Sequence, residues 1–526
     1  MICFISGNKS YHTSVQNSGH YKKQDWICNV IEHRIFFHDF GKAAFGTLEV
    51  EISGIPGTEV DVALGEAAVS GRVNRTPGGY CCFKSGKITL SAPRGVYQFE
   101  LPRHRVPKYT VFSVTPPGGV EVAPFRYAEI SGECEVHGFV RHELFPEWDE
   151  EASAFESSDA DLNRIWEFCK YSIKATAAFG VFIDGERERC PYEGDTYINQ
   201  LGWFCCSRDS EIPRRTIELF QEHRTWPIEW SLLMPQIVQD YVLYSGDEKF
   251  LSEILPGLES RLLNELENSD GLIGGNDFYR ELIDWPMNER DGYESTGVSL
   301  VPNCMRYSAL KRMGELTGDS AYFAKAEKLK SVICQKMQIP GGFVDSPGST
   351  HTAQHSQFFP VATGVATPEA IAGLGELEIK CSVYAVQFLL DALYLGNFGQ
   401  RALELMRSKG LRSWLHMIDD LGSTVALEAW DISLKPNLDW NHAWGAAPAN
   451  IIPRRLCGIR PVKPGFKEFI FAPQPGDLEF FKSTHPTPQG SIMVEYDSGR
   501  FSVTVPEGCR AICRGKSYSE NFSVTL

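Results

Sequence analysis

Five carboxylates and two arginines lie within fifteen residues of this chain, in the stretch VFIDGERERCPYEGD from Val181 to Asp195. Carboxyl groups crowded together raise one another's pKa, and Arg187 and Arg189 can offset part of that repulsion. A protonated carboxylic acid beside an ionised one is the pair that glycosidic bond hydrolysis requires: one protonates the leaving oxygen and the other activates water. The alternative is a solvated loop whose acids and arginines pair with one another.

Three kinds of segment surround this stretch. Period-two alternation from about Arg34 to Val140, as in TLEVEISG and TEVDVALGE, predicts an all-β sandwich. From Ser158 the pattern changes to a helical one behind a Ser/Asp cap. The buried face of this first helix is expected to contain Leu162, Ile165, Trp166, Cys169 and Ile173. After about Leu456 the alternation returns, with a hairpin predicted at Asp497-Ser498-Gly499.

Glycines divide the helical region at regular intervals. Gly246, Gly318 and Gly396 are predicted to end helices, and Asp247, Asp319 and Asn397 to cap the next ones. This rhythm favours a ring of helix pairs, an α/α toroid of roughly a dozen helices, over an irregular helical domain. The expected order is an N-terminal β-sandwich (residues 1–150), an (α/α)6 toroid (151–456) and a small C-terminal β-sandwich (457–526).

The acidic stretch is then predicted to be a loop between the first toroid helix and the next helical element, EIPRRTIELF. Loops of this kind can place polar groups around the axial mouth of such a fold. Glu188, Glu186 and Glu193 are all candidates for the acid, because they share the loop.

The motif DGERERCPYEGD, with TVALEAWD and DWNHAWG downstream, resembles the catalytic domain of glycoside hydrolase family 78, the α-L-rhamnosidases. Three further segments extend the resemblance over most of the chain. FHDFGKAAFGTLEVEISG is similar to the family's β-sandwich, ELIDWPMNERDGYE to its Asp-Trp substrate loop, and CGIRPVKPGF to the start of its C-terminal β domain. In many members the loop is longer, with a tryptophan in place of Tyr192, and here Asp184 stands two residues closer to Glu188.

The resemblance implies an inverting exo-glycosidase that releases terminal α-L-rhamnose or a closely related sugar, with Glu188 as general acid and Glu428 as general base. Inversion places the two carboxyl groups about 6.5 to 9.5 Å apart. The substrate-binding residues that it implies are Asp184, Arg189, Tyr192, Asp195, Trp230, Asp284, Trp285, Trp430, His442 and Trp444. Each of these tryptophans except Trp285 could instead pack in the core, and His442 could be a buried, hydrogen-bonded histidine.

Two other functions remain open at this point. The first is an inverting hydrolase or lyase acting on uronic acid-containing oligosaccharides, which would need arginines free of carboxylate partners, whereas acids outnumber arginines in the loop. The second is a non-catalytic carbohydrate-binding relative, for which the pair of Glu188 and Glu428 would have no use.

The resemblance implies a carbohydrate substrate, and composition argues against other classes of partner. A net charge of −16 without any Lys/Arg run argues against nucleic acid and against anionic membranes. No His/Cys cluster has zinc spacing and no phosphate-binding fingerprint is complete, so neither metal nor cofactor is expected. Fifteen cysteines without C-x-x-C pairs predict reduced thiols and a cytoplasmic location. The start, MICFISGNKSYHTS, has no secretory pattern, so a periplasmic location would need a separate leader, and homo-oligomerisation stays open.

Overall fold

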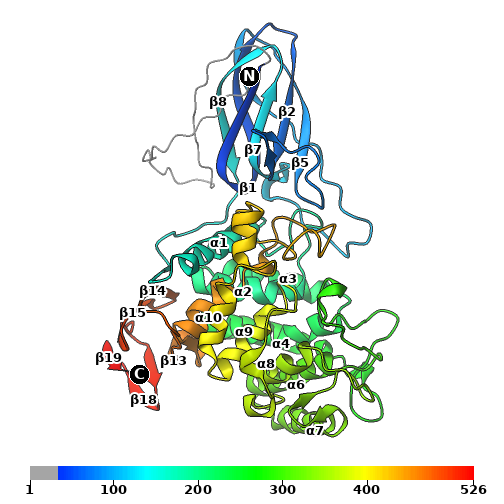
Figure 1. The fold of residues 1–526 in the computed structure, drawn as a ribbon, viewed down its shortest axis with the longest axis vertical. Coiled ribbons are helices and arrows are strands. Elements are labelled where there is room, and N and C mark those ends of the chain that lie inside the picture. Colours follow the sequence, from blue (N-terminus) through cyan, green and yellow to red (C-terminus); the bar gives the residue numbers. More distant parts are fainter. Residues whose placement is uncertain (1–33, 526) are drawn as a thin grey trace.

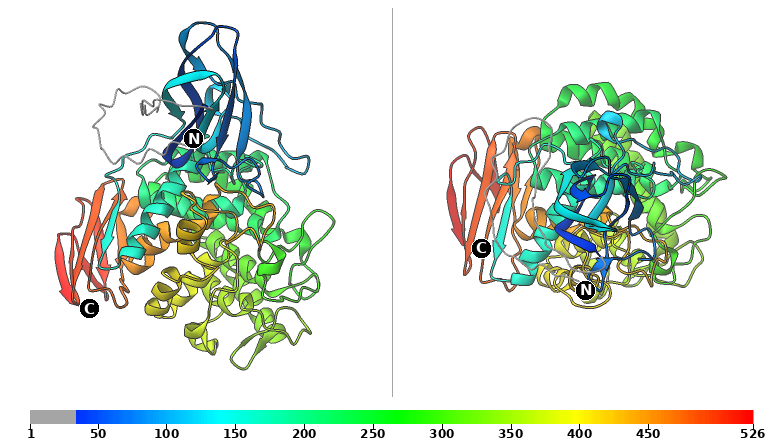
Figure 2. Two further views of the ribbon diagram at one scale, coloured as in Figure 1. Left: turned by 45° about the horizontal axis from the view of Figure 1, so that its top comes forward. Right: turned by 90° about the horizontal axis from the view of Figure 1, so that it is seen from above.

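The structure is a computed structural model that describes residues 34–525. The opening segment MICFISGNKSYHTS, for which the sequence predicts no secretory signal, lies outside the described residues. The chain forms N-terminal strands, a central helical region and C-terminal strands (Figure 1). Viewed from above, the N-terminal strands lie over the helices, whereas the C-terminal strands lie at their side (Figure 2).

The N-terminal strands follow the period-two pattern of the sequence. In β1, Leu48, Val50 and Ile52 are fully buried and alternate with more exposed residues. The strands are β1 (Ile35–Gly54), β2 (Glu59–Gly65), β3 (Ala68–Val69), β4 (Arg72–Val73), β5 (Phe83–Thr89), β6 (Arg94–Gln98), β7 (Ala123–Ser131) and β8 (Cys134–Glu143). The main sheet has the order β5-β2-β7-β1-β6, and β8 also pairs with β1. A bulge between Asp39 and Ala44 lets β1 bend along this path.

The helical region begins as the sequence predicts. The carboxylate of Asp159 accepts a hydrogen bond from the Leu162 N–H at 2.9 Å, and the predicted apolar face of α1 is buried. The helices are α1 (Ala160–Thr176), α2 (Glu193–Cys206), α3 (Glu211–Glu222), α4 (Ile228–Ser245), α5 (Glu248–Leu258), α6 (Leu300–Thr317), α7 (Ser320–Met337), α8 (His355–Thr363), α9 (Val386–Leu395), α10 (Gly399–Met406) and α11 (Pro448–Ile451). A two-stranded pair, β10 (Gln338–Ile339) and β11 (Gly342–Phe343), follows α7.

Two of the three predicted helix junctions have the expected chemistry. Gly246 and Gly318 end α4 and α6 in the left-handed conformation, and the side chains of Asp247 and Asp319 cap α5 and α7. The third prediction is wrong in part. Asn397 itself adopts the left-handed conformation, with φ 62°, and α10 starts at Gly399 without a side-chain cap.

The acidic stretch does not lead directly to EIPRRTIELF, which is α3. Instead α2 begins inside the stretch, at Glu193, so the prediction for the next helical element is wrong. All fourteen residues of α2 are buried, and a helix buried on every side has no amphipathic pattern to reveal it. Asp195 consequently lies in the first turn of a buried helix.

The C-terminal strands form two sheets, with the orders β12-β13-β17-β18 and β19-β16-β15-β14-β9. Their bounds are β9 (Ala154–Ser157), β12 (Ile459–Pro461), β13 (Glu468–Phe471), β14 (Phe480–Thr487), β15 (Gly490–Asp497), β16 (Arg500–Val503), β17 (Arg510–Cys513), β18 (Lys516–Tyr518) and β19 (Phe522–Thr525). The segment that precedes α1 thus joins a sheet built from the end of the chain. The predicted hairpin is confirmed, because Asp497 pairs with Arg500 across Ser498 and Gly499, both at positive φ.

The cysteines among residues 34–525 form no disulfide bonds. Every cysteine from Cys81 to Cys513 is free, and all but Cys334 are buried. Among residues 34–525, no helix has the length and hydropathy that crossing a bilayer requires.

Candidate active site

The loop between α1 and α2 is fixed by its own backbone. The Asp184 N–H donates to the Cys190 carbonyl at 2.9 Å, and the Cys190 N–H donates back to the Asp184 carboxylate at 2.8 Å. A side chain at Gly185 is impossible without rearrangement, because its Cβ would lie 2.6 Å from a carboxylate oxygen of Asp439. The loop therefore presses against the segment of residues 428–442, which supplies the other half of the site.

Arg187 joins the two glutamates that the sequence singles out. Its two terminal nitrogens donate to the carboxylate of Glu428 at 2.5 and 2.7 Å. Its Nε donates to Glu188 Oε1 at 3.3 Å. All three side chains are buried. Glu188 and Glu428, 240 positions apart in the sequence, are thus brought together by one guanidinium group.

Glu428 is held in its ionised form. Burial acts to raise its pKa, but the charge and hydrogen bonds of Arg187, together with the charges of His442 and Lys435, outweigh burial and lower the pKa to about 2. Lys435 contributes a second cation, with its Nζ 3.2 Å from Glu428 Oε1. The Asp439 N–H also donates to Glu428 Oε2 at 2.9 Å. A carboxylate with these partners keeps its negative charge throughout the physiological pH range.

Glu188 has a different setting. Its second oxygen accepts a hydrogen bond from the Tyr192 hydroxyl, and burial raises the pKa of that phenol. The Tyr192 ring meets Trp230 edge to face, with ring centres 5.4 Å apart. Gly194 makes this packing possible, because a Cβ there would lie 2.5 Å from the Trp230 ring. Glu188 therefore lies between a cation on one side and an aromatic wall on the other.

Asp195 and His442 form a buried pair in the same cluster of side chains as Glu188, Arg187 and Glu428. The Asp195 carboxylate and His442 Nε2 are 2.7 Å apart. Burial raises the pKa of Asp195 and outweighs the opposing charge of His442. The His442 ring lies against Trp444, with ring centres 4.7 Å apart, and Trp444 Nε1 donates to the Glu428 carbonyl. The first turn of α2 is thereby tied to the segment that carries Glu428.

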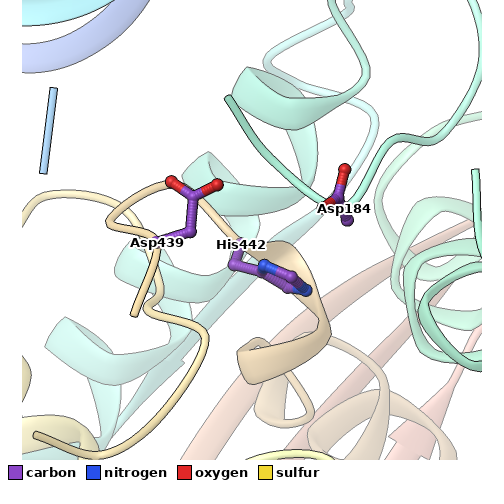
Figure 3. A group of neighbouring side chains, drawn as sticks. All are labelled: Asp184, Asp439 and His442. Atoms are coloured by element: carbon purple, nitrogen blue, oxygen red, sulfur yellow. The ribbon is translucent and has the colours of Figure 1, made fainter. Parts of the chain in front are cut away.

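Asp184, Asp439 and His442 converge from the loop and from the segment before α11 (Figure 3). One ligand atom from each lies within 4.8 Å of the others. Burial raises the pKa of Asp439 to about 6, and burial and the charge of Glu188 raise the pKa of Asp184. Asp184 Oδ2 and Asp439 Oδ1 are buried and accept no hydrogen bond from the described residues. Such oxygens could accept hydrogen bonds from sugar hydroxyls or ligate a cation.

Some predicted residues lie apart from this cluster. Asp284 accepts hydrogen bonds from the Trp285 N–H and from Ser382, and one of its oxygens lies 2.8 Å from His355 Nε2. Trp430 is fully buried, and its Nε1 donates to the Cys381 carbonyl. These residues form a neighbouring buried network.

Trp285 lies between this network and the cluster, with Lys435 Nζ 5.8 Å from the centre of its ring. Arg189 faces the opposite way, because it pairs with Glu186 at 2.8 Å and with Glu121 of the N-terminal domain.

The N-terminal part of the chain contributes residues that no motif of the sequence marks. Glu66 accepts a hydrogen bond from the Asn441 amide at 2.9 Å, and Asn441 in turn accepts one from the Glu186 N–H. The Tyr80 N–H donates to the Leu438 carbonyl at 2.8 Å. Asp439 is also absent from the residues predicted from the sequence. Its position beside Trp440 in DWNHAWG, three residues before His442, was a signal that could have identified it.

Glu193 has contacts that suit a structural role. It is fully buried, accepts a hydrogen bond from the Thr225 hydroxyl, and pairs with Arg261 at 2.9 Å. The variant Glu193→Ala is expected to lower the free energy of unfolding by about 3–5 kcal/mol, because it leaves Arg261 buried without its partner. Urea denaturation measures this loss. Glu211→Ala, at an exposed site, is the control, with an expected change within about 0.5 kcal/mol. A stable Glu193→Ala protein that had lost turnover would instead make Glu193 the acid.

Comparison with known proteins agrees with the fold. Residues 150–456 match the family model of the bacterial alpha-L-rhamnosidase 6 hairpin glycosidase domain, and residues 458–513 match the bacterial alpha-L-rhamnosidase C-terminal domain. An α-L-rhamnosidase of Alteromonas sp. (strain LOR) is 22% identical over an alignment that covers 89% of this chain and 54% of that protein.

Two crystal structures share the architecture. The family 78 rhamnosidase of Bacillus sp. GL1 has a TM-score of 0.73 at 19% identity, over 93% of this chain and 55% of that one. The α-L-rhamnosidase of Aspergillus terreus has a TM-score of 0.77 at 16% identity, over 96% and 63%. This chain spans about half the length of the Alteromonas and Bacillus relatives. The family expected from the acidic loop is confirmed: the chain belongs to the bacterial α-L-rhamnosidase six-hairpin glycosidase family.

Proposed function

We propose that the chain is an inverting exo-glycoside hydrolase that releases terminal α-L-rhamnose, or a closely related sugar, from glycans or glycosides. Glu188 is the general acid and Glu428 the general base of this proposal. The observation that carries it is the meeting of the two carboxylates on Arg187. The helices that carry them are proposed to close into an (α/α)6 toroid between two β-sandwich domains, as the family description of six hairpins suggests.

The shared guanidinium sets an upper limit on the separation of the two carboxylates, and inversion is compatible with that limit. Each is hydrogen-bonded to the same guanidinium, which limits the distance between their nearest oxygens to roughly 8 Å. Inverting glycosidases keep their two carboxyl groups about 6.5 to 9.5 Å apart, which leaves room for a water molecule. The attacking water would approach from the Glu428 side and the leaving oxygen from the Glu188 side.

Arg187 limits the basicity of Glu428 in the free protein. A carboxylate with a pKa of about 2 is a weak base, and both of its oxygens are bonded to Arg187. Activation of water therefore requires Arg187 to give up one of these hydrogen bonds. Bound substrate can offer it another acceptor, because sugar hydroxyl oxygens accept N–H donors.

The inner part of the cluster suits a neutral deoxysugar. Asp184, Asp195 and Asp439 are acceptors for sugar hydroxyls, and the rings of Trp230 and Trp444 suit an apolar sugar face with its methyl group. The arginines of the loop do not favour a uronic acid, because Arg187 and Arg189 are both already paired with carboxylates. This preference supports a rhamnosidase over the alternative hydrolase or lyase.

The proposal is tested with a panel of nitrophenyl glycosides of rhamnose, glucose, arabinose and glucuronic acid. Turnover is expected on the α-L-rhamnoside, and NMR of the first released sugar should show the inverted anomeric configuration. A retained anomer would contradict the role of Glu428. Fastest turnover on the glucuronide would favour the alternative substrate class. Binding of rhamnose without hydrolysis of any substrate would identify a carbohydrate-binding relative.

A further inference from the structure

Two exposed tyrosines that precede β7 lie beside the cluster. Tyr80 is 41% exposed and Tyr109 is 63% exposed. The guanidinium carbon of Arg187 is 5.4 Å from the centre of the Tyr80 ring. The Tyr109 ring is exposed, but partial burial of its hydroxyl raises its pKa to about 12, and Arg187, Glu188 and the Tyr80 side chain also act on it, which places all four groups near one another. In a site whose other groups are buried, these rings face solvent.

Both tyrosines are held in place by the helical domain. The backbone of Tyr80 bridges to Asp439, and Gly79 beside it has φ 58°, with room for no Cβ because the Leu438 carbonyl oxygen would be 2.9 Å away. The loop of Tyr109 is fixed by the stacking of Phe112 on His223, with ring centres 4.2 Å apart. The same loop is tied to the acidic loop, since the Val114 N–H donates to the Arg189 carbonyl. The two rings are therefore placed relative to Glu188 before substrate arrives.

The position of the two tyrosines relative to Glu188 determines which part of a substrate they can contact. A general acid protonates the oxygen that joins the sugar to its leaving group, so the leaving group must lie next to the acid. Trp230, Trp444 and Asp195, which belong to the same cluster, are buried. The leaving group must extend from Glu188 towards solvent, where Tyr80 and Tyr109 are.

We propose that Tyr80 and Tyr109 form the subsite for the leaving group, and that they bind it through the apolar face of a ring. This inference rests on the proposed hydrolase function. Aromatic side chains bind flat rings by offset stacking, and the face of a pyranose by contact with its C–H groups. An aryl aglycone and a second sugar share this chemistry. The N-terminal domain thereby determines which glycosides the enzyme accepts, whereas the helical domain selects the sugar that is released.

The test compares Tyr80→Ala and Tyr109→Ala on three glycosides of one sugar: a nitrophenyl glycoside, a disaccharide and a methyl glycoside. Both variants are expected to lose about 5- to 20-fold in kcat/KM on the substrates whose leaving group is a ring. The methyl glycoside, which has no ring to stack, should be unaffected. A loss on the aryl glycoside alone assigns the subsite to aromatic aglycones, and a loss on the disaccharide alone assigns it to sugars.

Two controls separate binding from support of the loop. Tyr109→Phe keeps the ring and should behave as the wild type. Inhibition by the free monosaccharide, which fills only the inner part of the site, should be unchanged in every variant. Equal losses on all three glycosides, with weaker monosaccharide inhibition, would overturn the proposal by showing that the tyrosines only support the acidic loop. Unchanged kcat/KM on both ring-bearing substrates would overturn it too.

Binding without turnover distinguishes failure of the subsite from failure of the hydrolase function. Calorimetry on Glu188→Gln protein can measure the affinities of the nitrophenyl and methyl glycosides directly. If the subsite is real, adding Tyr109→Ala weakens binding of the nitrophenyl glycoside alone, by a similar factor. This result would stand even if the wild type hydrolysed no glycoside, in which case the proposed function alone would fall. Equal weakening for both glycosides, or none, would overturn the subsite.

Discussion

Glu428→Gln is expected to lose hydrolysis of every glycoside, by about 10²- to 10⁴-fold in kcat, whatever the leaving group. Glutamine has nearly the shape of glutamate and can still accept a hydrogen bond from Arg187, but it cannot take a proton from water. The loss should be independent of leaving-group acidity, because water activation is required for all substrates. Steady-state kinetics on nitrophenyl and alkyl glycosides measure it.

The matched control for this variant is Glu129→Gln in the N-terminal domain. Glu129 is a buried carboxylate held by two arginines, Arg72 at 2.5 Å and Arg75 at 2.7 Å, as Glu428 is held by Arg187 and Lys435. Both variants should lower the free energy of unfolding, but only Glu428→Gln should lower turnover. If the wild type released the retained anomer and azide restored turnover to Glu428→Ala as a glycosyl azide of inverted configuration, Glu428 would be a nucleophile and the mechanism would be wrong.

Glu188→Gln, unlike Glu428→Gln, is expected to show a loss that depends on the leaving group. An alkyl or sugar leaving group needs protonation, so kcat on such substrates should fall by about 10²- to 10⁴-fold. A nitrophenolate leaves with little help, so the loss on nitrophenyl glycosides should be much smaller. The ratio of the two losses, measured by steady-state kinetics on the same preparation, is the diagnostic quantity.

The matched control here is Glu186→Gln, two residues away in the same loop. Glu186 is equally buried but pairs with Arg189 and Lys84, on the side of the N-terminal domain. It should change turnover on both classes of substrate to the same small extent. A leaving-group-dependent loss in Glu186→Gln, and none in Glu188→Gln, would transfer the role of the acid to Glu186.

The helices that could be predicted from the sequence are those with one polar face. The helix α1 combines a capping aspartate with a single apolar stripe, so its position follows from local chemistry. The helix α2 has no polar face, because it is enclosed by neighbours that come from distant parts of the chain. Its existence depends on tertiary packing, and no pattern within its fourteen residues reports that packing.

The candidate site shows the same division. Glu188 and Glu428 stand in motifs that mark them individually, but the guanidinium that joins them follows only from the approach of two segments 240 positions apart. The sequence could not show which of Trp444 and Trp430 belongs to the site either. Both are buried in the structure. The structure separates them by their partners, because Trp444 Nε1 donates to the carbonyl of Glu428, whereas Trp430 Nε1 donates to that of Cys381.

Two hydrogen bonds bear on how this protein can change over evolution. One joins Tyr80 to Leu438 and the other joins Glu66 to Asn441. An accessory domain joined only by a linker can be lost or exchanged without cost to the chemistry. Here the loops that follow β2 and β4 supply hydrogen bonds to Asn441 and Leu438, in the same segment of residues 428–442 as Glu428. Recombination at the boundary between the strands and the helices would remove these hydrogen bonds, so we expect the two parts to be inherited together.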